Sequence, residues 1–393
     1  IFEKGLIDGY TFDNGGHGLI WGNKSRCRLL LDHLGKPVDM PVNKGLGFVD
    51  CRDNSIYQVQ PREPYKWQTE QGYRETLAAL RSMGQLSMEE CAAAMQTDVQ
   101  TWLEERGLTE NQEAYDYIKV VMACQNAMAE PRMAPAGDFL GYMAMARDIK
   151  MNLHSGSVAT IAEPGCMAIP LAIEEALNEA GGEIRRSTPV EEVIVEDGKI
   201  RGVIIPSQDG GYDNIECDTV ICNIPPKHIF NILHPRHFPA KWVNLLQNKY
   251  WSAGLLSCYM GLKNNIWEGF GVDERSFIWM PGIIKHEGFI GAVDMVMWNF
   301  AACAKRAPEG KRDFCFSTAL TDQEMRNPKK VTRVINYCMD WFKRNFKGWE
   351  ENVEFVIWTP SVEAYGNWRP LGEKRPPIRS PYVDGLFFVG DQY

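Results

Sequence analysis

The stretch 163–203, EPGCMAIPLAIEEALNEAGGEIRRSTPVEEVIVEDGKIRGV, carries the clearest structural pattern in the chain. Apolar residues recur at helical spacing over 167–180, and the pair Gly181-Gly182 indicates where this helix ends. Pro170 would fall in the first turn, where its missing N–H costs little. After a short strand, two strand-like runs meet at Asp197-Gly198, a strong hairpin signal. The stretch therefore predicts a helix followed by an antiparallel hairpin.

Further runs extend this pattern in both directions. A third strand at Tyr212–Cys217 and a short buried strand in DTVICNIPP (218–226) are predicted after the hairpin. From Trp67 to about Met151 the spacing is helical, and SMEECAAAMQTDVQTWLEERG (87–107) reads as one helix. Ser87 and Glu90 would form its capping box, and Gly107 would end it.

The rest of the chain mixes strands with one long helix. Strand-like runs occur in SAGLLSCYMGL (252–262), FIGAVDMVMWNF (289–300) and NVEFVIWTP (352–360). A helix is predicted in PKKVTRVINYCMDWFKRNF (328–346), and a glycine-bounded apolar strand in YVDGLFFVGDQY (382–393). One strand-rich unit is thus interrupted by a helical insertion and then by a mixed one.

Two glycine-containing segments are candidates for ligand binding. In GYTFDNGGHGLIWG (9–22), the pair Gly15-Gly16 lets the backbone approach a flat molecule or adopt positive φ. Gly390-Asp391 follows a buried strand, and ligands of open α/β sheets lie beyond the carboxyl ends of strands. Taken alone, the first segment is equally compatible with a plain turn, and a Gly-Asp pair after a strand is more often a turn than a ligand site.

Composition limits the class of protein. A length of 393 residues predicts about two domains. The hydrophobic fraction of 45% and the charged fraction of 24% are typical of globular proteins. A net charge of −9 argues against a nucleic-acid partner. No run of apolar residues is long enough to span a bilayer, and no signal peptide opens the sequence.

The cysteines and the common catalytic motifs narrow the chemistry. The eleven cysteines include no Cys-x-x-Cys pair and no zinc-type spacing, which indicates free thiols in a reducing cytosol and no metal site. A Walker loop, His-Glu-x-x-His and Gly-x-Ser-x-Gly are all missing from the sequence. The sequence therefore gives no sign of metal, nucleotide-triphosphate or serine-nucleophile chemistry.

Taken together and in this order, GYTFDNGGHG, the stretch 163–203, DTVICNIPP and YVDGLFFVGDQY resemble the successive flavin-domain blocks of one family. It is the FAD-dependent oxidoreductase family of the amine oxidases, protoporphyrinogen oxidases and phytoene desaturases, the last being the most similar. The implied fold class is α/β: a Rossmann-like FAD-binding domain, incomplete here, with an inserted, discontinuous α+β substrate domain. The FAD-binding segments would be 1–55, 158–228 and 372–393, with a helical substrate insertion at 56–157 and a mixed one at 229–371.

The resemblance implies six cofactor-binding residues and no catalytic side chain. Gly15, Gly16 and His17 would line the flavin ring. Val190 would meet the adenine through its backbone, and Gly390 and Asp391 would lie against the pyrophosphate and ribityl chain.

The chain also departs from the family pattern. It shows neither the opening Gly-x-Gly-x-x-Gly turn with its acidic partner nor the helix that should follow Gly390-Asp391. We therefore expect a fragment that lacks both. Many relatives have Gly-Gly-Met before the central helix, whereas this chain has Gly165-Cys166-Met167. Cys166 is expected to be a small buried apolar residue without redox chemistry.

The implied activity is desaturation, oxidation or isomerisation of an apolar, polyene or lipid-like small molecule by hydride transfer to FAD. The Met, Trp and Phe residues of FLGYMAMARDIKM (139–151), MVMWNF and FVIWTP would suit such a substrate, although core packing also accounts for them. One alternative is an amine oxidase, with Tyr365 and Trp368 as an aromatic cage. Another is a flavin-free binding or scaffold protein. We expect a cytoplasmic location or peripheral membrane contact, and the sequence leaves the oligomeric state open.

Overall fold

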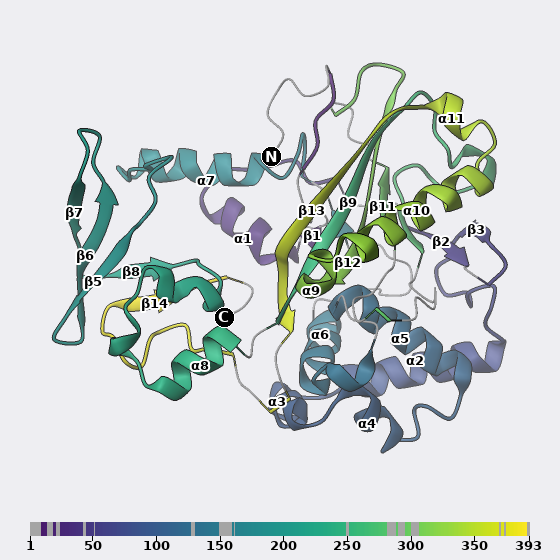
Figure 1. Ribbon diagram of the computed structural model, residues 1–393. Coiled ribbons are helices and arrows are strands. Elements are labelled where there is room, and N and C mark those ends of the chain that lie inside the picture. The colour runs from purple at the N-terminus through teal and green to yellow at the C-terminus, as the bar shows by residue number, and fades with distance from the viewer. Residues whose placement is uncertain are drawn as a thin grey trace. The chain divides into compact units, whose positions relative to one another are not determined.

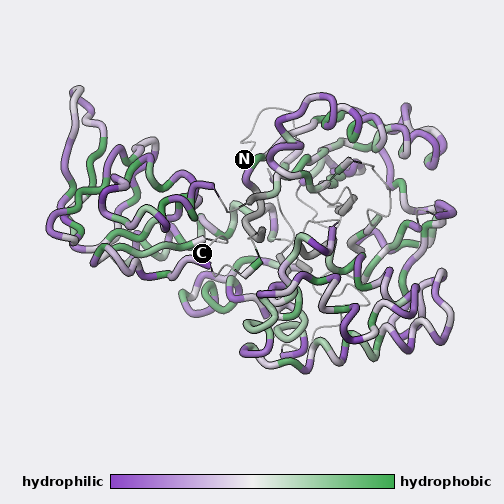
Figure 2. The backbone as a smooth tube through the Cα atoms, turned by 60° about the horizontal axis from the view of Figure 1, so that its bottom comes forward, coloured by the Kyte–Doolittle hydropathy of each residue, from purple (hydrophilic) through white to green (hydrophobic). Residues whose placement is uncertain are grey.

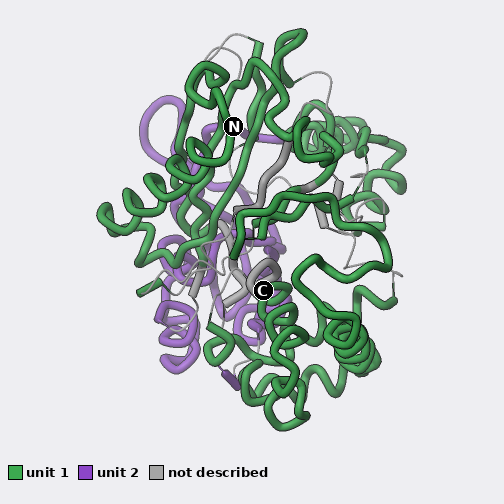
Figure 3. Tube along the Cα trace, turned by 90° about the vertical axis from the view of Figure 1, so that its right-hand side faces the viewer, with its two compact units in different colours: residues 1–182, 253–364 green, residues 183–252, 365–393 purple. Residues whose placement is uncertain are grey.

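The computed structural model shows two compact units, which are described separately (Figures 1 and 3). Unit 1 comprises Ile1–Gly182 and Ala253–Ala364, and unit 2 comprises Glu183–Ser252 and Tyr365–Tyr393. The structure describes residues 9–13, 19–20, 24–41, 45–50, 52–126, 130–148, 159–160, 162–248, 251–280, 288–289, 295–299, 306–368, 371–372 and 375–390.

A mixed sheet of seven strands forms the centre of unit 1, in the order β13-β9-β12-β11-β10-β2-β3. The strands are β2 (Leu46–Asp50), β3 (Ser55–Gln58), β9 (Trp251–Leu262), β10 (Phe277–Met280), β11 (Met295–Asn299), β12 (Arg312–Thr321) and β13 (Val353–Trp368). β2 runs parallel to β10, with Phe48 opposite Trp279, whereas β12 is antiparallel to β9 and β11. The strand runs predicted at 252–262, 289–300 and 352–360 are thereby confirmed as β9, β11 and β13.

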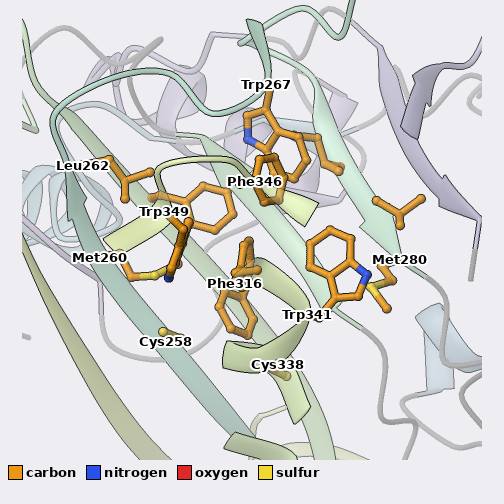
Figure 4. Close-up of a cluster of buried hydrophobic side chains, with 14 of the residues drawn as sticks. Cys258, Met260, Leu262, Trp267, Met280, Phe316, Cys338, Trp341, Phe346 and Trp349 are labelled. Atoms are coloured by element: carbon orange, nitrogen blue, oxygen red, sulfur yellow. The ribbon is translucent and has the colours of Figure 1, made fainter. Parts of the chain in front are cut away.

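The long helix α10 (Pro328–Asn345) lies along one face of this sheet (Figure 1). Its first turn carries Pro328, and Asn327 caps it by accepting hydrogen bonds from two backbone N–H groups. Its apolar face packs with aromatic residues of neighbouring elements, among them Trp267, Phe316 and Trp349 (Figure 4). The predicted helix at 328–346 is confirmed, and it covers the main core of the unit. Short helices α9 (Asp322–Met325), α11 (Trp349–Asn352) and η6 (Glu268–Phe270) flank it.

A group of helices follows β3 in the chain. They are α2 (Glu70–Gly84), α3 (Met88–Ala93), η2 (Ala94–Gln96), α4 (Val99–Glu104), α5 (Gln112–Asn126), η3 (Pro131–Met133) and α6 (Ala136–Asp148). The capping box of Ser87 and Glu90 is confirmed, and Gly107 has φ +66° in the turn that follows α4. Hydrophobic and hydrophilic residues are interspersed along the backbone (Figure 2), and α2 buries one face with Tyr73, Thr76 and Met83.

The prediction of one continuous helix over 87–107 is wrong. Thr97 is extended, with φ −118° and ψ 141°, and Asp98 starts a new helix by accepting a hydrogen bond from the Thr101 N–H. The backbone at 97–98 is bonded to a distant segment instead: the Ala136 N–H donates to the Thr97 carbonyl at 2.8 Å. Tertiary pairing therefore overrides the local helical preference at this point.

Helix α7 (Ala168–Glu179) confirms the helix predicted in the stretch 163–203. Gly181 adopts φ +82°, and the Gly182 N–H donates to the Leu177 carbonyl, which ends the helix as expected. α7 packs on α1 (Arg26–His33), and Lys36 bonds two of its glutamates. The short strands β1 (Leu19–Ile20) and β4 (Ala159–Thr160), which precede α1 and α7 in the sequence, pair antiparallel.

Unit 2 contains a three-stranded antiparallel sheet and a two-stranded parallel one. The first consists of β5 (Glu192–Glu196), β6 (Lys199–Pro206) and β7 (Tyr212–Glu216), and the second of β8 (Val220–Cys222) and β14 (Leu386–Phe388). Asp197 and Gly198 both have positive φ, as a two-residue hairpin turn of this kind requires. The helices are η4 (Pro226–Asn231), η5 (Pro235–His237) and α8 (Ala240–Asn248). The hairpin and the third strand are confirmed. The short strand is confirmed as β8, but it is not buried as predicted: Ile221 is 65% exposed and only Cys222 is buried.

The short strand expected between α7 and the hairpin is absent from the described residues. The segment 183–187 is exposed, and Glu183 forms an ion pair with Arg185 at 2.7 Å instead of facing a neighbouring strand. The boundaries of the two compact units also differ from those of the five predicted segments. For example, β2 belongs to the predicted FAD-binding segment 1–55, yet β2 and β3 lie in the large sheet with strands of the predicted substrate insertion 229–371. The assignment of segments to FAD or to substrate stays a prediction.

Candidate functional site

The segment 9–13, which leads into the glycine pair of GYTFDNGGHGLIWG, is held on several sides in unit 1. The Tyr10 hydroxyl donates to Glu354 at 2.6 Å, and the Thr11 N–H donates to the Arg306 carbonyl at 2.9 Å. The buried ring of Phe12 packs against Tyr259 with 5.3 Å between centroids. The approach to the glycine pair is therefore fixed by both backbone and side-chain contacts.

Asp13 is buried and uses both of its carboxylate oxygens. Oδ1 accepts the backbone N–H of Cys166 at 2.9 Å, and Oδ2 accepts Nη1 of Arg306 at 2.9 Å. One side chain thus connects the segment 9–13 to the loop before α7 and to Arg306, which precedes β12. Such charge-assisted hydrogen bonds are shorter and stronger than neutral ones.

Arg306 is fully buried between two carboxylates. Its Nη1 faces Asp13, and its Nε donates to Oδ2 of Asp313 at 3.2 Å. Burial raises the pKa of Asp313 to about 7, and the neighbouring guanidinium opposes this rise. The three residues form a buried network of alternating charge, here called the Asp13–Arg306–Asp313 network.

The loop before α7 approaches this network without room for a side chain at Gly165. A Cβ placed there would lie 3.0 Å from Oδ1 of Asp13 and 3.4 Å from Nη1 of Arg306. The next residue, Cys166, is half-buried rather than fully buried as expected. Burial, and to a smaller extent Asp13, raises the pKa of its thiol to about 12, so the thiol stays protonated and does not act as a nucleophile.

The residues expected to bind FAD fall into three groups. Gly15, Gly16, His17 and Asp391 lie outside the described residues, so their assignment stays a prediction. Val190 is half-buried and packs against the core of unit 2, just before β5. Tyr365 and Trp368, the aromatic cage of the amine oxidase alternative, belong to β13, but their side chains are outside the described part of the structure.

Gly390 lies where a ligand of a parallel sheet would be expected. β8 and β14 run parallel with Cys222 opposite Phe388, so both strands end at the same edge. Gly390 follows at that edge, exposed and with φ +128°, a conformation that side chains other than glycine's rarely adopt. A bare, exposed backbone at the carboxyl edge of a parallel pair fits the close approach of a dinucleotide pyrophosphate.

Comparison with known proteins gives the family. The sequence profile of the family described as flavin containing amine oxidoreductase matches residues 2–393. The chain belongs to this family. Membership of this family of FAD-dependent oxidoreductases implies FAD as the cofactor.

Curated relatives of the chain include phytoene desaturases. The chain is 31% identical over 263 residues to the neurosporene-forming phytoene desaturase of Rhodobacter capsulatus, covering 58% of this chain and 48% of the relative. It is 32% identical over 100 residues to the zeta-carotene-forming phytoene desaturase of Myxococcus xanthus, covering 25% of this chain and 18% of the relative. The chain thus spans about half the length, or less, of the curated relatives it matches.

Solved structures share the fold. An oxidoreductase from Methanosarcina mazei superposes with a TM-score of 0.70 at 14% identity, over 98% of this chain and 84% of the other. Cyclohexylamine oxidase from Brevibacterium oxydans gives a TM-score of 0.64 at 14% identity, over 96% and 82%. Putrescine oxidase bound to putrescine gives a TM-score of 0.63 at 13% identity, over 97% of this chain and 85% of the other. Identities this low show the fold alone, and the expected α/β class is confirmed.

Two further findings concern membranes and metals. None of the helices in the described ranges combines the length and the apolar character needed to cross a bilayer. Within the same ranges, no three His, Cys, Asp or Glu side chains are grouped so that they could hold a metal ion.

Sequence reasoning missed Arg306 and Asp313. Asp13 stands in the segment that was singled out, but its own role was not predicted. Arg306 lies 293 residues further along the chain and carries no motif that could have connected it with Asp13. The sequence around 305–313 does contain a run of charged residues, but such a run is typical of a solvated loop and does not indicate a buried ion pair.

Proposed function

We propose that the protein is an FAD-dependent oxidoreductase that desaturates, oxidises or isomerises an apolar, polyene or lipid-like substrate by hydride transfer to FAD. The observation that supports this choice is the 31% identity to a phytoene desaturase over 263 residues. The amine oxidases, by comparison, share the fold at 13–14% identity, which favours no substrate.

Bound FAD supplies the hydride acceptor in this proposal. Gly15, Gly16 and His17 would lie along the flavin ring. Val190 would meet the adenine through its backbone. Gly390 and Asp391 would lie against the pyrophosphate and ribityl chain.

The described side chains agree with chemistry that needs no protein nucleophile. The Cys166 thiol is held protonated beside Asp13, and Arg306 is paired with the carboxylates of both Asp13 and Asp313. The task left to the chain is to hold a C–H bond over the cofactor and to exclude water. Apolar side chains suit that task, although the described ones of α6, such as Phe139, Leu140 and Met143, are buried in the helical core.

The test compares substrate classes with one preparation. The FAD-loaded protein is mixed anaerobically with phytoene in liposomes, and separately with putrescine and cyclohexylamine. We expect the flavin absorbance to bleach with the polyene and the product to gain conjugated double bonds or isomerise, as chromatography with absorbance detection would show. Bleaching by the amines alone would contradict the proposal and favour amine oxidation. A folded preparation of the full-length gene product that retains no flavin would favour a binding or scaffold role.

A further inference from the structure

We propose that the Asp13–Arg306–Asp313 network is a positioning device for FAD, which sets the place of the chain segment leading into Gly15 and Gly16. The inference rests on the proposed role of those glycines beside the flavin ring. None of the three network residues is assigned a contact with substrate. They would act through the backbone that they hold.

The contacts show how the segment is held. Arg306 bonds it twice, through its carbonyl to the Thr11 N–H and through Nη1 to the Asp13 carboxylate. The other oxygen of Asp13 accepts the Cys166 N–H. Three pieces of chain that are remote in sequence therefore meet at one carboxylate, two residues before Gly15.

The position of Asp13 cannot change without consequence for the residues that follow. Gly15 follows Asp13 by two residues, so chain connectivity keeps it within about 7 Å of the Asp13 Cα atom. Phe12 is fixed against Tyr259 on the other side. On the side of α7, the hydrogen bond from the Cys166 N–H holds the Asp13 carboxylate at 2.9 Å.

The choice of charged residues is itself informative. Arg306 and Asp313 are fully buried and Asp13 is 7% exposed. Buried ion pairs stabilise a fold little better than well-packed apolar residues do, whereas their directional hydrogen bonds specify one geometry. A network whose only role was stability could be apolar; this one fixes a backbone position.

The experiment measures FAD binding in folded variants. Asp13→Asn keeps an acceptor for the Cys166 N–H but removes the charge that faces Arg306. We expect its FAD dissociation constant to rise at least about tenfold, the usual result of losing one charge-assisted hydrogen bond. We also expect the visible absorption and circular dichroism of the bound flavin to change, because the ring environment changes.

The matched control is Ser317→Ala. Ser317 is buried in β12, the strand that holds Asp313, and its hydroxyl bonds only Ser257 among the described contacts, at 2.8 Å. This substitution should lower the melting temperature and leave the FAD dissociation constant and the flavin spectra unchanged. It separates loss of stability from loss of positioning.

A second variant covers the case in which Asp13→Asn does not fold. Arg306→Lys keeps the positive charge but loses the forked donors, and the same two readouts should change in the same direction. Parental FAD affinity and parental flavin spectra in either folded variant would overturn the proposal. A parent enzyme that oxidises amines, but loses FAD affinity on Asp13→Asn, would refute the proposed substrate and support the network.

Discussion

Gly165 is the residue whose substitution should affect the site most directly without removing a polar group. A methyl group there would lie 3.0 Å from Oδ1 of Asp13, which is held from two sides and cannot easily yield. We expect Gly165→Ala to lower the free energy of unfolding by about 1–3 kcal/mol, as overpacking does. Urea denaturation would measure the change.

Gly141 provides the control for this prediction. It lies within α6, and a Cβ there would meet only the Met88 terminal methyl at 3.9 Å, an ordinary contact. Gly141→Ala should therefore be neutral, or stabilising by about 0.5–1 kcal/mol, because alanine is favoured inside helices. Equal losses for the two variants would show that the space at Gly165 is not limiting.

Asp313 should make stability depend on pH near neutrality. Its pKa is raised by burial from 3.8 to about 7, so between these values the folded chain binds a proton that the unfolded chain has lost. The contribution of Asp313 to the free energy of unfolding is therefore complete below about pH 4. It is lost as the pH rises to about 7, and above that the free energy of unfolding no longer changes with the titration of this group. The total loss is on the order of 4 kcal/mol.

Asp313→Asn tests this dependence, because the amide stays neutral at every pH and can still accept from Arg306. We expect the variant to gain stability relative to the parent as the pH rises from 5 to 8. Thermal melts at four or five pH values would measure the difference. Parallel curves for the two proteins would show that Asp313 is ionised throughout this range.

At the scale of single residues, the sequence pointed to part of the site. The glycines, the histidine and the aspartate of GYTFDNGGHG attracted attention because of their types and their neighbours in the chain. Arg306 and Asp313 did not, because an ion pair across 293 residues leaves no periodicity or spacing to read. Burial, which gives both residues their importance, is a property of the packed molecule.

Among the structural elements, the parallel pair β8–β14 depends on one glycine. Gly385 has φ +80°, and a Cβ there would lie 2.2 Å from the Asp218 carbonyl oxygen. Its own carbonyl accepts the Val220 N–H at 2.9 Å. We expect Gly385→Ala to separate the start of β14 from β8 and to speed hydrogen exchange of the amides in both strands.

A second glycine isolates the steric part of this effect. Gly210 has φ +82°, but nothing lies within 4 Å of a Cβ built there. Gly210→Ala should cost about 1 kcal/mol from backbone strain alone, and Gly385→Ala at least about 1 kcal/mol more. Exchange monitored by mass spectrometry, together with urea denaturation, would compare them. Similar behaviour of the two variants would contradict the role assigned to Gly385.

Local signals predicted most elements and few of their partners. The Asp197-Gly198 turn, the end of α7 and the cap of α3 follow from residue types at fixed offsets, and all were confirmed. The break at Asp98 was missed because the cause is a backbone bond to residue 136. The parallel pairing of β2 with β10 joins strands that are remote in sequence, and alternating patterns carry no information about such partners.

On the scale of the molecule, the two units have separate cores. Phe342 is fully buried in the core of unit 1 and Leu233 in that of unit 2 (Figure 4 shows the first core). We expect Phe342→Ala to destabilise unit 1 by about 3–5 kcal/mol, and Leu233→Ala to destabilise unit 2 by about 2–5 kcal/mol. Hydrogen exchange followed along the sequence would show where each loss appears.

The expected pattern is faster exchange confined to the unit that carries the substitution. Residues 183–252 should keep parental protection in Phe342→Ala, and β9 and β12 should keep it in Leu233→Ala. Faster exchange throughout the chain in both variants would mean that the two units unfold as one cooperative body.

The contact between Asp13 and Arg306 has a consequence for the order in which the chain folds. Closing a loop of 293 residues costs conformational entropy, and contacts this remote form after the local ones that shorten the loop. During synthesis, Asp13 leaves the ribosome long before Arg306 exists, so for most of translation its carboxylate has no guanidinium to bind. The segment before the glycines therefore takes its final place late, and under the positioning role proposed above a nascent chain would bind FAD only after Arg306 has reached Asp13.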